Sequence, residues 1–537
     1  MKFQSKEVNI GQLKMGGLNP IRIQSMTNTN TLDVTATVEQ SIRLIEAGCE
    51  LVRITTPGMA EVEALKKIQE KIRSLGYQTP LAADVHFNPK VAEEAASFIE
   101  KVRINPGNYV DKKQSNKKFN TDLEYQQELN RIADRIFPLI EICKKHNTAV
   151  RIGVNHGSLS DRIINRYGNT VHGMAMSAIE FARIFQKQNF TNLVMSLKSS
   201  DVKTMIYSTR QFVEMMLQEE MAYPLHLGVT EAGAGEDGRI KSATGIGTLL
   251  LNGIGSTIRV SLTEAPEKEI PVAKSILEKV QQILQNENCK ALPFSNKHHY
   301  IRRKTIAIGK YGGENPVSII TPTPQNEWDG CFEAESSNFT KNSSENRTVA
   351  YCNLTQNGNL IPLLNFAKKE QNKNPLILEK TFNEETLDDY TFHASILFGN
   401  LLIEGICDGF KINHTSFNQS ISDELASNIL QACGIRHTKA EIISCPSCGR
   451  TQYNIEYLLA EVKQAISHIK GLKIGVMGCV VNGPGEMADA DYGLVGAGKD
   501  KVWLFKGQNV IEKNIESKEA VYKLIELLKK ENRWIEK

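Results

Sequence analysis

Residues 51–85 read LVRITTPGMAEVEALKKIQEKIRSLGYQTPLAADV and contain one complete strand–helix–strand unit. The apolar runs at its two ends, LVRIT (51–55) and LAADV (81–85), have the length of buried strands. Between them, apolar residues recur at helical spacing from Ala60 to Leu75. A strand, a helix and a second strand in this order indicate a parallel βαβ unit, because parallel strands need a long crossover connection.

The same alternation continues on both sides of this unit, from residue 21 to about residue 286. The other strand-like runs are IRIQSM (21–26), KVRIN (101–105), AVRIGV (149–154), LVMSLK (193–198), LHLGV (225–229) and TIRVSL (257–262). Helical patterns lie between the runs, for example at Val34–Ala47, Lys90–Ile99 and Val202–Glu219. Eight such runs in about 265 residues predict an α/β fold with a TIM (β/α)8 barrel. A doubly wound open sheet is the alternative, but no G-x-G-x-x-G follows the first strand.

Length and composition narrow the class of protein. A chain of 537 residues should form two to four domains. A net charge of +3 over this length gives no case for a nucleic-acid or membrane surface, and no apolar run is long enough to span a membrane. The N-terminal stretch lacks the apolar core of a signal peptide, so we expect a cytoplasmic protein. Ten cysteines are too few for a disulfide framework.

Arginine interrupts the apolar runs of several strands. These residues are Arg53, Arg103, Arg151 and Arg259, and Arg22 has a similar position in the first strand. A buried guanidinium is costly unless it is paired, so one such residue would indicate a structural ion pair. Several on different strands predict a positive barrel mouth, where active sites of this fold lie. Because guanidinium groups bind phosphate oxygens in a fork, we expect a phosphorylated small substrate.

Other polar residues follow the strand ends. They are Asp84, His86, Asn155, His156, Lys198, Thr230 and Glu231. Two glycine-rich segments, 233–238 and 243–248, follow the seventh strand, in the region where barrels of this type hold phosphate. Glu231 has two interpretations, which the sequence leaves open. It either neutralises the arginines or transfers a proton.

The middle of the chain, from 287 to about 437, differs in character from the barrel region. One internal similarity stands out there, since GIGTLLLNGIGSTIRV (245–260) resembles LFGNLLIEGICDGFKI (397–412). The second copy has Lys411 in place of Arg259. We therefore expect an inserted α/β domain with βα units related to the barrel, which acts as a spacer or support. Chance similarity between segments rich in glycine and leucine is the alternative.

Two cysteine motifs lie in the last hundred residues. Ser444–Arg450 read SCPSCGR, and Gly478–Glu486 read GCVVNGPGE. Thiolates select iron–sulfur clusters, zinc or copper(I), and a structural zinc site would need a fourth cysteine or histidine. His437 and His468 are the candidates for that fourth position, but neither has the usual spacing. Three thiolates with Glu486 as a weaker oxygen ligand favour a [4Fe–4S] cluster with one iron open to substrate.

These motifs resemble those of the (E)-4-hydroxy-3-methylbut-2-enyl diphosphate synthase family, in its longer form with an inserted middle domain. The resemblance extends through the barrel. The matching segments are IQSMTNT (23–29), ADVHFN (83–88), VRINPGN (102–108), RIGVNHGSL (151–159), HLGVTEAG (226–233), IRVSLTE (258–264), SCPSCGRT (444–451) and GVMGCVVNGPGEMADADYG (475–493). It implies three domains: a substrate-binding barrel (1–286), an inserted α/β spacer (287–437) and a [4Fe–4S] domain (438–537).

The resemblance also implies an activity. Family members are oxidoreductases that reductively open and dehydrate 2-C-methyl-D-erythritol 2,4-cyclodiphosphate to (E)-4-hydroxy-3-methylbut-2-enyl diphosphate. The two electrons pass through the [4Fe–4S] cluster from ferredoxin or flavodoxin, in the methylerythritol phosphate pathway of isoprene biosynthesis.

Residue roles carry over at the matching positions. The implied cluster ligands are Cys445, Cys448, Cys479 and Glu486. The implied diphosphate-binding residues are Arg53, Arg103, Arg151, Asn155, Lys198, Arg259 and Ser261, with Asp84 and His86 lining the pocket. Glu231 would transfer a proton near the substrate hydroxyl, and Glu486 would yield its iron to a substrate oxygen.

The sequence is also compatible with two other functions. One is a TIM-barrel phosphate enzyme with a structural zinc module, and the other is a non-catalytic electron-transfer protein. For the family reaction, the barrel mouth and the cluster must meet over one substrate. We expect the insert to allow this within one chain, whether the protein is a monomer or a homodimer.

Overall fold

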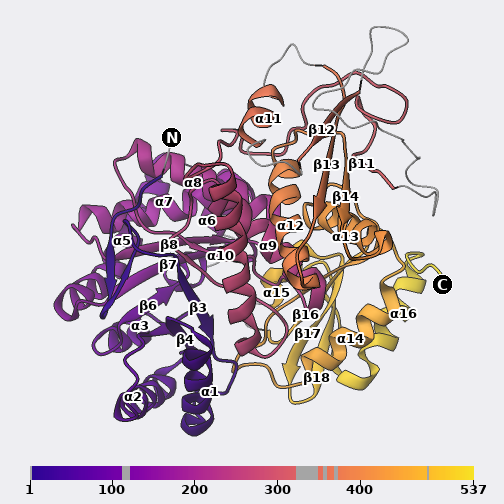
Figure 1. Ribbon diagram of the computed structural model, residues 1–537. Helices are drawn as coiled ribbons and strands as arrows, with labels where there is room; N and C mark the ends of the chain where they lie inside the picture. The colour runs from indigo at the N-terminus through magenta and orange to yellow at the C-terminus, as the bar shows by residue number, and fades with distance from the viewer. Residues whose placement is uncertain are drawn as a thin grey trace. The chain divides into compact units, whose positions relative to one another are not determined.

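Eight parallel strands in the first half of the chain form the predicted TIM barrel (Figure 1). The computed structural model describes residues 3–111, 121–321, 349–354, 360–367, 373–480 and 483–536. The barrel strands are β3 (Arg22–Met26), β4 (Leu51–Thr55), β5 (Leu81–Asp84), β6 (Lys101–Ile104), β7 (Ala149–Asn155), β8 (Leu193–Lys198), β9 (His226–Leu227) and β10 (Thr257–Ile258). They pair in chain order, and β10 pairs with β3. A parallel bridge between Met195 and Leu225 closes the ring between β8 and β9.

Helices follow the strands along the chain, as the sequence predicted. They include α1 (Val34–Ala47), α2 (Met59–Ser74), α3 (Pro89–Ala96), α5 (Asp122–His146), α7 (Val171–Lys187), α8 (Val202–Gln218), α9 (Gly235–Leu251) and α10 (Glu269–Asn286). Short helices α4 (Pro106–Tyr109) and α6 (Asp161–Tyr167) lie in the loops after β6 and β7. Local chemistry sets the ends of α1, because Asp33 accepts a hydrogen bond from the Ala36 amide and Gly48 adopts a left-handed conformation.

A small hairpin covers the N-terminal end of the barrel. Strands β1 (Val8–Ile10) and β2 (Leu13–Met15) pair antiparallel. Their apolar side chains pack against Leu51, Ala82 and Ala149 in the barrel strands. The hairpin closes this end of the barrel with an apolar layer.

Two predicted strands are shorter than expected. The runs 225–229 and 257–262 contain only two ladder residues each, in β9 and β10. The residues that follow leave the sheet and bond to the C-terminal part of the chain instead, since the Ser444 amide donates to the Glu231 carbonyl and Thr263 bonds to Ser444. The ends of β9 and β10 are therefore set by contacts with Ser444, which lies far away in the sequence.

Contacts divide the chain into two compact units. One comprises Arg239–Gly253 and Ser275–Thr438, and the other comprises Phe3–Gly238, Ile254–Lys274 and Lys439–Lys537. The second unit therefore holds both the barrel strands and the cysteine motifs. The expected domain limits near residues 286 and 437 stay a prediction.

The first unit contains a four-stranded parallel sheet with helices. The strand order is β11 (Ser318–Ile319), β14 (Gly409–His414), β13 (Leu376–Phe382) and β12 (Ala350–Asn353). The helices α11 (Leu360–Ala367), α12 (Leu387–Ile403) and α13 (Gln419–Ala432) belong to the same unit. The expected inserted α/β fold is therefore present in the described residues of this region.

The internal sequence similarity corresponds to two alike helix–turn–strand segments. In one, α9 leads to β10 through Gly253, and in the other α12 leads to β14 through Gly405; both glycines have positive φ. The helices also contact each other in a reciprocal way. A Cβ on Gly247 would meet Ile396 at 2.6 Å, and one on Gly399 would meet Thr244 at 2.7 Å. These positions correspond in the two copies, which favours kinship over chance.

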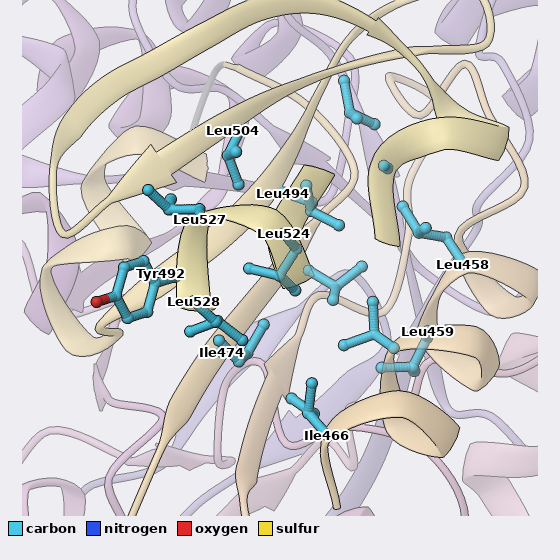
Figure 2. Close-up of a cluster of buried hydrophobic side chains, with 14 of the residues drawn as sticks. Leu458, Leu459, Ile466, Ile474, Tyr492, Leu494, Leu504, Leu524, Leu527 and Leu528 are labelled. Atoms are coloured by element: carbon cyan, nitrogen blue, oxygen red, sulfur yellow. The ribbon is translucent and has the colours of Figure 1, made fainter. Parts of the chain in front are cut away.

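The C-terminal part of the second unit is a five-stranded sheet. Its strands are β15 (Glu441–Ser444), β16 (Lys473–Met477), β17 (Tyr492–Gly498), β18 (Lys501–Lys506) and β19 (Asn509–Glu516). Helices α14 (Ile455–Ile466) and α16 (Ala520–Lys530) pack on it through leucines and isoleucines such as Leu458, Leu494 and Leu524 (Figure 2). The short run Glu441–Ser444 and the segment KVWLFKGQNV (501–510) predict β15 and the β18–β19 hairpin, whereas the glycines of β17 weaken its strand pattern. The sequence also predicts a final helix over Glu516–Asn532. This helix is present as α16 but begins later, because β19 pairs with β18 through Glu516.

Among the described residues, no helix combines the length and the apolar character needed to cross a bilayer.

Candidate functional site

One cavity of about 90 Å³ at the C-terminal ends of the barrel strands brings the predicted site residues together. From the barrel it is lined by Arg53, Asp84, His86, Arg103, Arg151, Asn155, Lys198, Glu231, Arg259 and Ser261. From the C-terminal sheet it is lined by Cys445, Cys448, Cys479 and Glu486. All of these belong to the second compact unit. The same chain supplies both walls, in agreement with the expectation that the two parts meet within one chain.

Asp84 organises the cations on one side of the barrel mouth. Its carboxylate accepts a hydrogen bond from Arg103 Nη1 at 3.0 Å and lies 3.9 Å from Arg53 Nε. Burial would raise the pKa of Asp84, but the Arg53 and Arg103 guanidinium groups hold it well below its usual value. Burial lowers the pKa of His86 to about 3, so its ring is neutral and Nε2 accepts from Arg103 at 3.2 Å.

Arg259 is held by a different carboxylate. Its guanidinium bonds to Glu269 at the start of α10, with Nη2 3.2 Å from Oε1 and Nε 3.3 Å from Oε2. Ser25 donates to the same carboxylate at 2.7 Å. The pair is almost fully buried, with side-chain exposures of 6% and 1%. Arg259 is thus fixed at the cavity wall.

Arg151 and Lys198 carry the least compensated charge in the cavity. Nη1 of Arg151 is buried and has no hydrogen-bond partner among the described residues. Burial, followed by repulsion from neighbouring arginines, lowers the pKa of both side chains well below their usual values. A buried anion would relieve this repulsion, so the barrel wall has the electrostatics of a phosphate site.

Arg22 does not belong to this group, so its expected place in the positive mouth is wrong. It is the first residue of β3 and therefore lies at the opposite end of the barrel. Its guanidinium bonds to Glu50 at 2.7 Å and to the Lys14 carbonyl at 2.9 Å. Strand direction decides this, because the first residue of a parallel strand lies at the end of the barrel away from the mouth.

The cysteines lie in the loops after β15 and β16. Cys445 follows β15 directly, and its Sγ accepts a hydrogen bond from the Gly478 amide at 3.1 Å. Cys448 and Cys479 are hydrogen-bonded to each other. Burial raises the pKa of Cys445 to about 12, and the bond to Cys479 together with burial raises the pKa of Cys448 well above its usual value. Such thiols gain strongly from a positive metal group, because coordination deprotonates them.

Glu231 and Glu486 meet between the two walls. Their side chains share a hydrogen bond, and burial raises both pKa values. The shift is larger for Glu486, so Glu486 holds the shared proton and donates it to Glu231 Oε1. Glu231 Oε2 is buried and has no hydrogen-bond partner within the described chain. Glu231 also has φ of 49°, a left-handed conformation that costs energy for a side chain other than glycine and is concentrated at functional sites.

Specific contacts hold the cysteine loops against the barrel. Thr263 Oγ1 bonds to Ser444 Oγ at 2.6 Å and to the Cys445 carbonyl at 3.0 Å. On another side, His156 Nδ1 lies 3.0 Å from Asp489 Oδ1, and Ser200 donates to Oδ2 at 3.0 Å. The two walls of the cavity are therefore bonded at separate points around it.

Three thiols and one carboxyl line the same cavity, which is a donor set that an iron–sulfur cluster can use. In the part of the chain that the structure describes, no three His, Cys, Asp or Glu side chains converge on a point where one ion could bind. The ligands of a cluster contact different iron atoms, so they need not converge. His468, a candidate zinc ligand, bonds instead to the Ile535 carbonyl and packs edge-on against Trp534.

Sequence reasoning missed three contributors. Arg450 lines the cavity beside the cysteines, Glu269 holds Arg259, and Asp489 binds His156. Arg450 could have been found, since it lies within the first cysteine motif. Glu269 carries no local signal, because its partner comes from another part of the chain. Asp489 lies within the matched segment 475–493, but nothing there indicates a bond to His156.

Comparison with known proteins gives matches along nearly the whole chain. Residues 5–274 match the model of the GcpE TIM-barrel domain, and residues 441–530 match the GcpE protein C-terminal domain. The chain is 44% identical to 4-hydroxy-3-methylbut-2-en-1-yl diphosphate synthase (flavodoxin) from Bacteroides thetaiotaomicron, over 99% of this chain and 98% of the relative. It is 45% identical to the protein of the same name from Bacteroides fragilis, over 99% and 96%.

A matching solved structure shares little sequence with this chain. Dihydropteroate synthase from Xanthomonas albilineans matches 51% of this chain and 99% of its own, at 13% identity and a TM-score of 0.33. At that score the match adds nothing to what the strand order of the barrel shows.

Proposed function

This chain belongs to the GcpE family, and we propose that it catalyses reductive ring opening and dehydration of 2-C-methyl-D-erythritol 2,4-cyclodiphosphate to (E)-4-hydroxy-3-methylbut-2-enyl diphosphate. The observation that carries the proposal is one buried cavity with strand-end cations on its barrel wall and three thiols with a carboxyl on the other. In the reaction two electrons enter, a carbon–oxygen bond of the ring breaks, and a hydroxyl takes up a proton and leaves as water.

The barrel wall would bind the diphosphate. Arg151 and Lys198, whose charges lack compensation, would take the phosphate oxygens together with Arg53, Arg103 and Arg259. Guanidinium groups on several strands can contact the phosphate oxygens of a diphosphate from different directions. They also stabilise the charge that develops on the phosphate oxygen when the ring opens.

The opposite wall would hold a [4Fe–4S] cluster through Cys445, Cys448, Cys479 and Glu486. When bound, the cluster would supply the two electrons and Lewis-acid chemistry. To act as a ligand, Glu486 must give up the proton that it shares with Glu231. Glu231 Oε2 is the atom that we expect to hold a proton for the departing hydroxyl.

The relatives' names favour flavodoxin over ferredoxin as the electron donor. We further propose that the protein works in the cytoplasm, where thiols stay reduced, and that the barrel, insert and cluster domain act as one catalytic chain.

The test is anaerobic turnover of the cyclodiphosphate with a chemical reductant, after reconstitution with iron and sulfide. We expect a brown protein with about four iron and four sulfide per chain, the stoichiometry of one cluster. Glu231→Gln keeps the size of the side chain but cannot give up a proton, so kcat should fall about 100-fold or more. A cluster-loaded wild type that forms no product would contradict the proposal. A colourless protein that binds one zinc would support the phosphate-enzyme alternative.

A further inference from the structure

Arg450 is the cation in the cavity that comes from the cysteine loop, and the family-derived roles do not include it. Its guanidinium is hydrogen-bonded to Cys448 and also lies near Cys479 and Asp84. It therefore connects the sulfur side of the cavity to the carboxylate that organises the barrel arginines.

Arg450 also forms a boundary between two cavities. A second cavity, of about 400 Å³, is lined by residues 30–32 of the barrel and by the loops around Arg450 and Gly496. Arg450 and Cys479 are the residues that line both cavities. Arg450 and the cysteine side of the cavity therefore lie together at the boundary between the two cavities.

The position of Arg450 is restrained by the backbone before it. A Cβ on Gly449 would lie 2.4 Å from the Thr29 carbonyl oxygen, so the loop is pressed directly against the barrel. Nε and Nη1 of Arg450 are buried and make no hydrogen bond to any described residue. A buried guanidinium with free donors is costly as a purely structural element, which favours a role toward a bound group.

We propose that Arg450 is a positioning residue for the reductive step, which stabilises the reduced form of the cluster through its charge and its hydrogen bond to Cys448. One electron added to a thiolate-bound cluster increases its negative charge. A fixed positive charge at hydrogen-bond distance from a ligand sulfur favours that added charge, and hydrogen bonds to cluster sulfurs raise reduction potentials. This inference rests on the proposed function, because it requires the cluster.

The test is the midpoint potential of the reconstituted protein, measured by redox titration with electron paramagnetic resonance at matched iron content. Arg450→Met should shift the potential to a more negative value, and Arg450→Lys should lie between this variant and wild type. Lys463→Met is the matched control, since Lys463 is a cation of the same domain but bonds to Asp237 at the surface. Its potential should equal that of wild type.

Binding of inorganic diphosphate to the cluster-free proteins, measured by calorimetry, separates this role from phosphate binding. We expect the affinity of Arg450→Met to stay within about twofold of wild type. An unchanged potential with weaker diphosphate binding would overturn the proposal and make Arg450 one more phosphate ligand. If Arg450→Met takes up no iron, Arg450→Gln is used in its place. Equal midpoint potentials for Arg450→Gln, Arg450→Lys and wild type would overturn the proposal. A wild type without iron would instead refute the proposed function.

Discussion

The buried pair of Arg259 and Glu269 allows a quantitative test of how the barrel holds its cations. We predict that Glu269→Gln destabilises the protein, because it leaves a guanidinium charged and unpaired at 6% exposure. Removing one partner of a buried ion pair costs about 3–5 kcal/mol. Glutamine keeps the size of the side chain and can still accept the hydrogen bond from Ser25. The decrease in the free energy of unfolding therefore reports mainly the missing charge.

An anion in the cavity should reverse part of this loss. Inorganic diphosphate would place negative charge beside Arg259, and hydrogen bonds to charged groups contribute about 1.5–3 kcal/mol each. Diphosphate should therefore stabilise Glu269→Gln more than it stabilises wild type. The measurement is urea unfolding of the cluster-free proteins, with and without saturating diphosphate.

Glu267 provides a matched control on the turn just before Glu269. It pairs with Arg43 at 2.8 Å, but this pair is exposed, at 24% and 55%. Such pairs contribute at most about 1 kcal/mol, so Glu267→Gln should be nearly neutral and insensitive to diphosphate. The reasoning would be refuted if the two variants lost equal stability, or if diphosphate had the same effect on Glu269→Gln as on wild type.

Three further predictions concern the contact between the cysteine loops and the barrel. Mixing Arg259→Ala chains with Cys479→Ala chains should give no activity above the separate variants, because one chain supplies both walls; restored turnover would mean capping between subunits. Hydrogen bonding to Asp489 raises the pKa of His156 against the effect of burial, and His156 lowers that of Asp489. The free energy of unfolding should therefore differ most between wild type and His156→Asn at about pH 4 to 6.5, where both groups are charged. The difference should shrink as the pH rises through the raised pKa of His156. A difference that does not depend on pH would exclude this ion pair. In Gly485→Ala, the new Cβ would lie 2.5 Å from a barrel carbonyl oxygen, so kcat for the cyclodiphosphate should fall while iron uptake stays at the wild-type level.

The sequence predicted the barrel because its signal is local and repeated. Each βα unit carries its own apolar run and its own helical spacing, and α1 (Val34–Ala47) and β15 (Glu441–Ser444) begin and end as expected. Strand ends were less predictable where they depend on distant partners. The segment after β10 leaves the sheet to bond Ser444, some 180 residues away, and nothing near Thr263 indicates this.

The candidate site followed the same rule. Cysteines beside a glycine-rich turn and arginines inside apolar strands are rare patterns, so the sequence alone indicates that they belong to a site. Their partners are ordinary residues. Glu269 differs from its neighbour Glu267 only in what it faces in the folded chain, and sequence spacing carries no information about that.

The two walls of the cavity share one electrostatic property that links the proposed substrate to the proposed cofactor. On the barrel wall, burial and mutual repulsion lower the pKa values of Arg151 and Lys198. On the other wall, burial raises the pKa of the Cys445 thiol to about 12. Each wall thus gains most from a group of the opposite sign, an anion on the barrel side and a metal cation on the thiol side. A cavity that received only a phosphate, or only a metal, would leave one of these walls uncompensated, so its charge pattern favours a reaction that needs both.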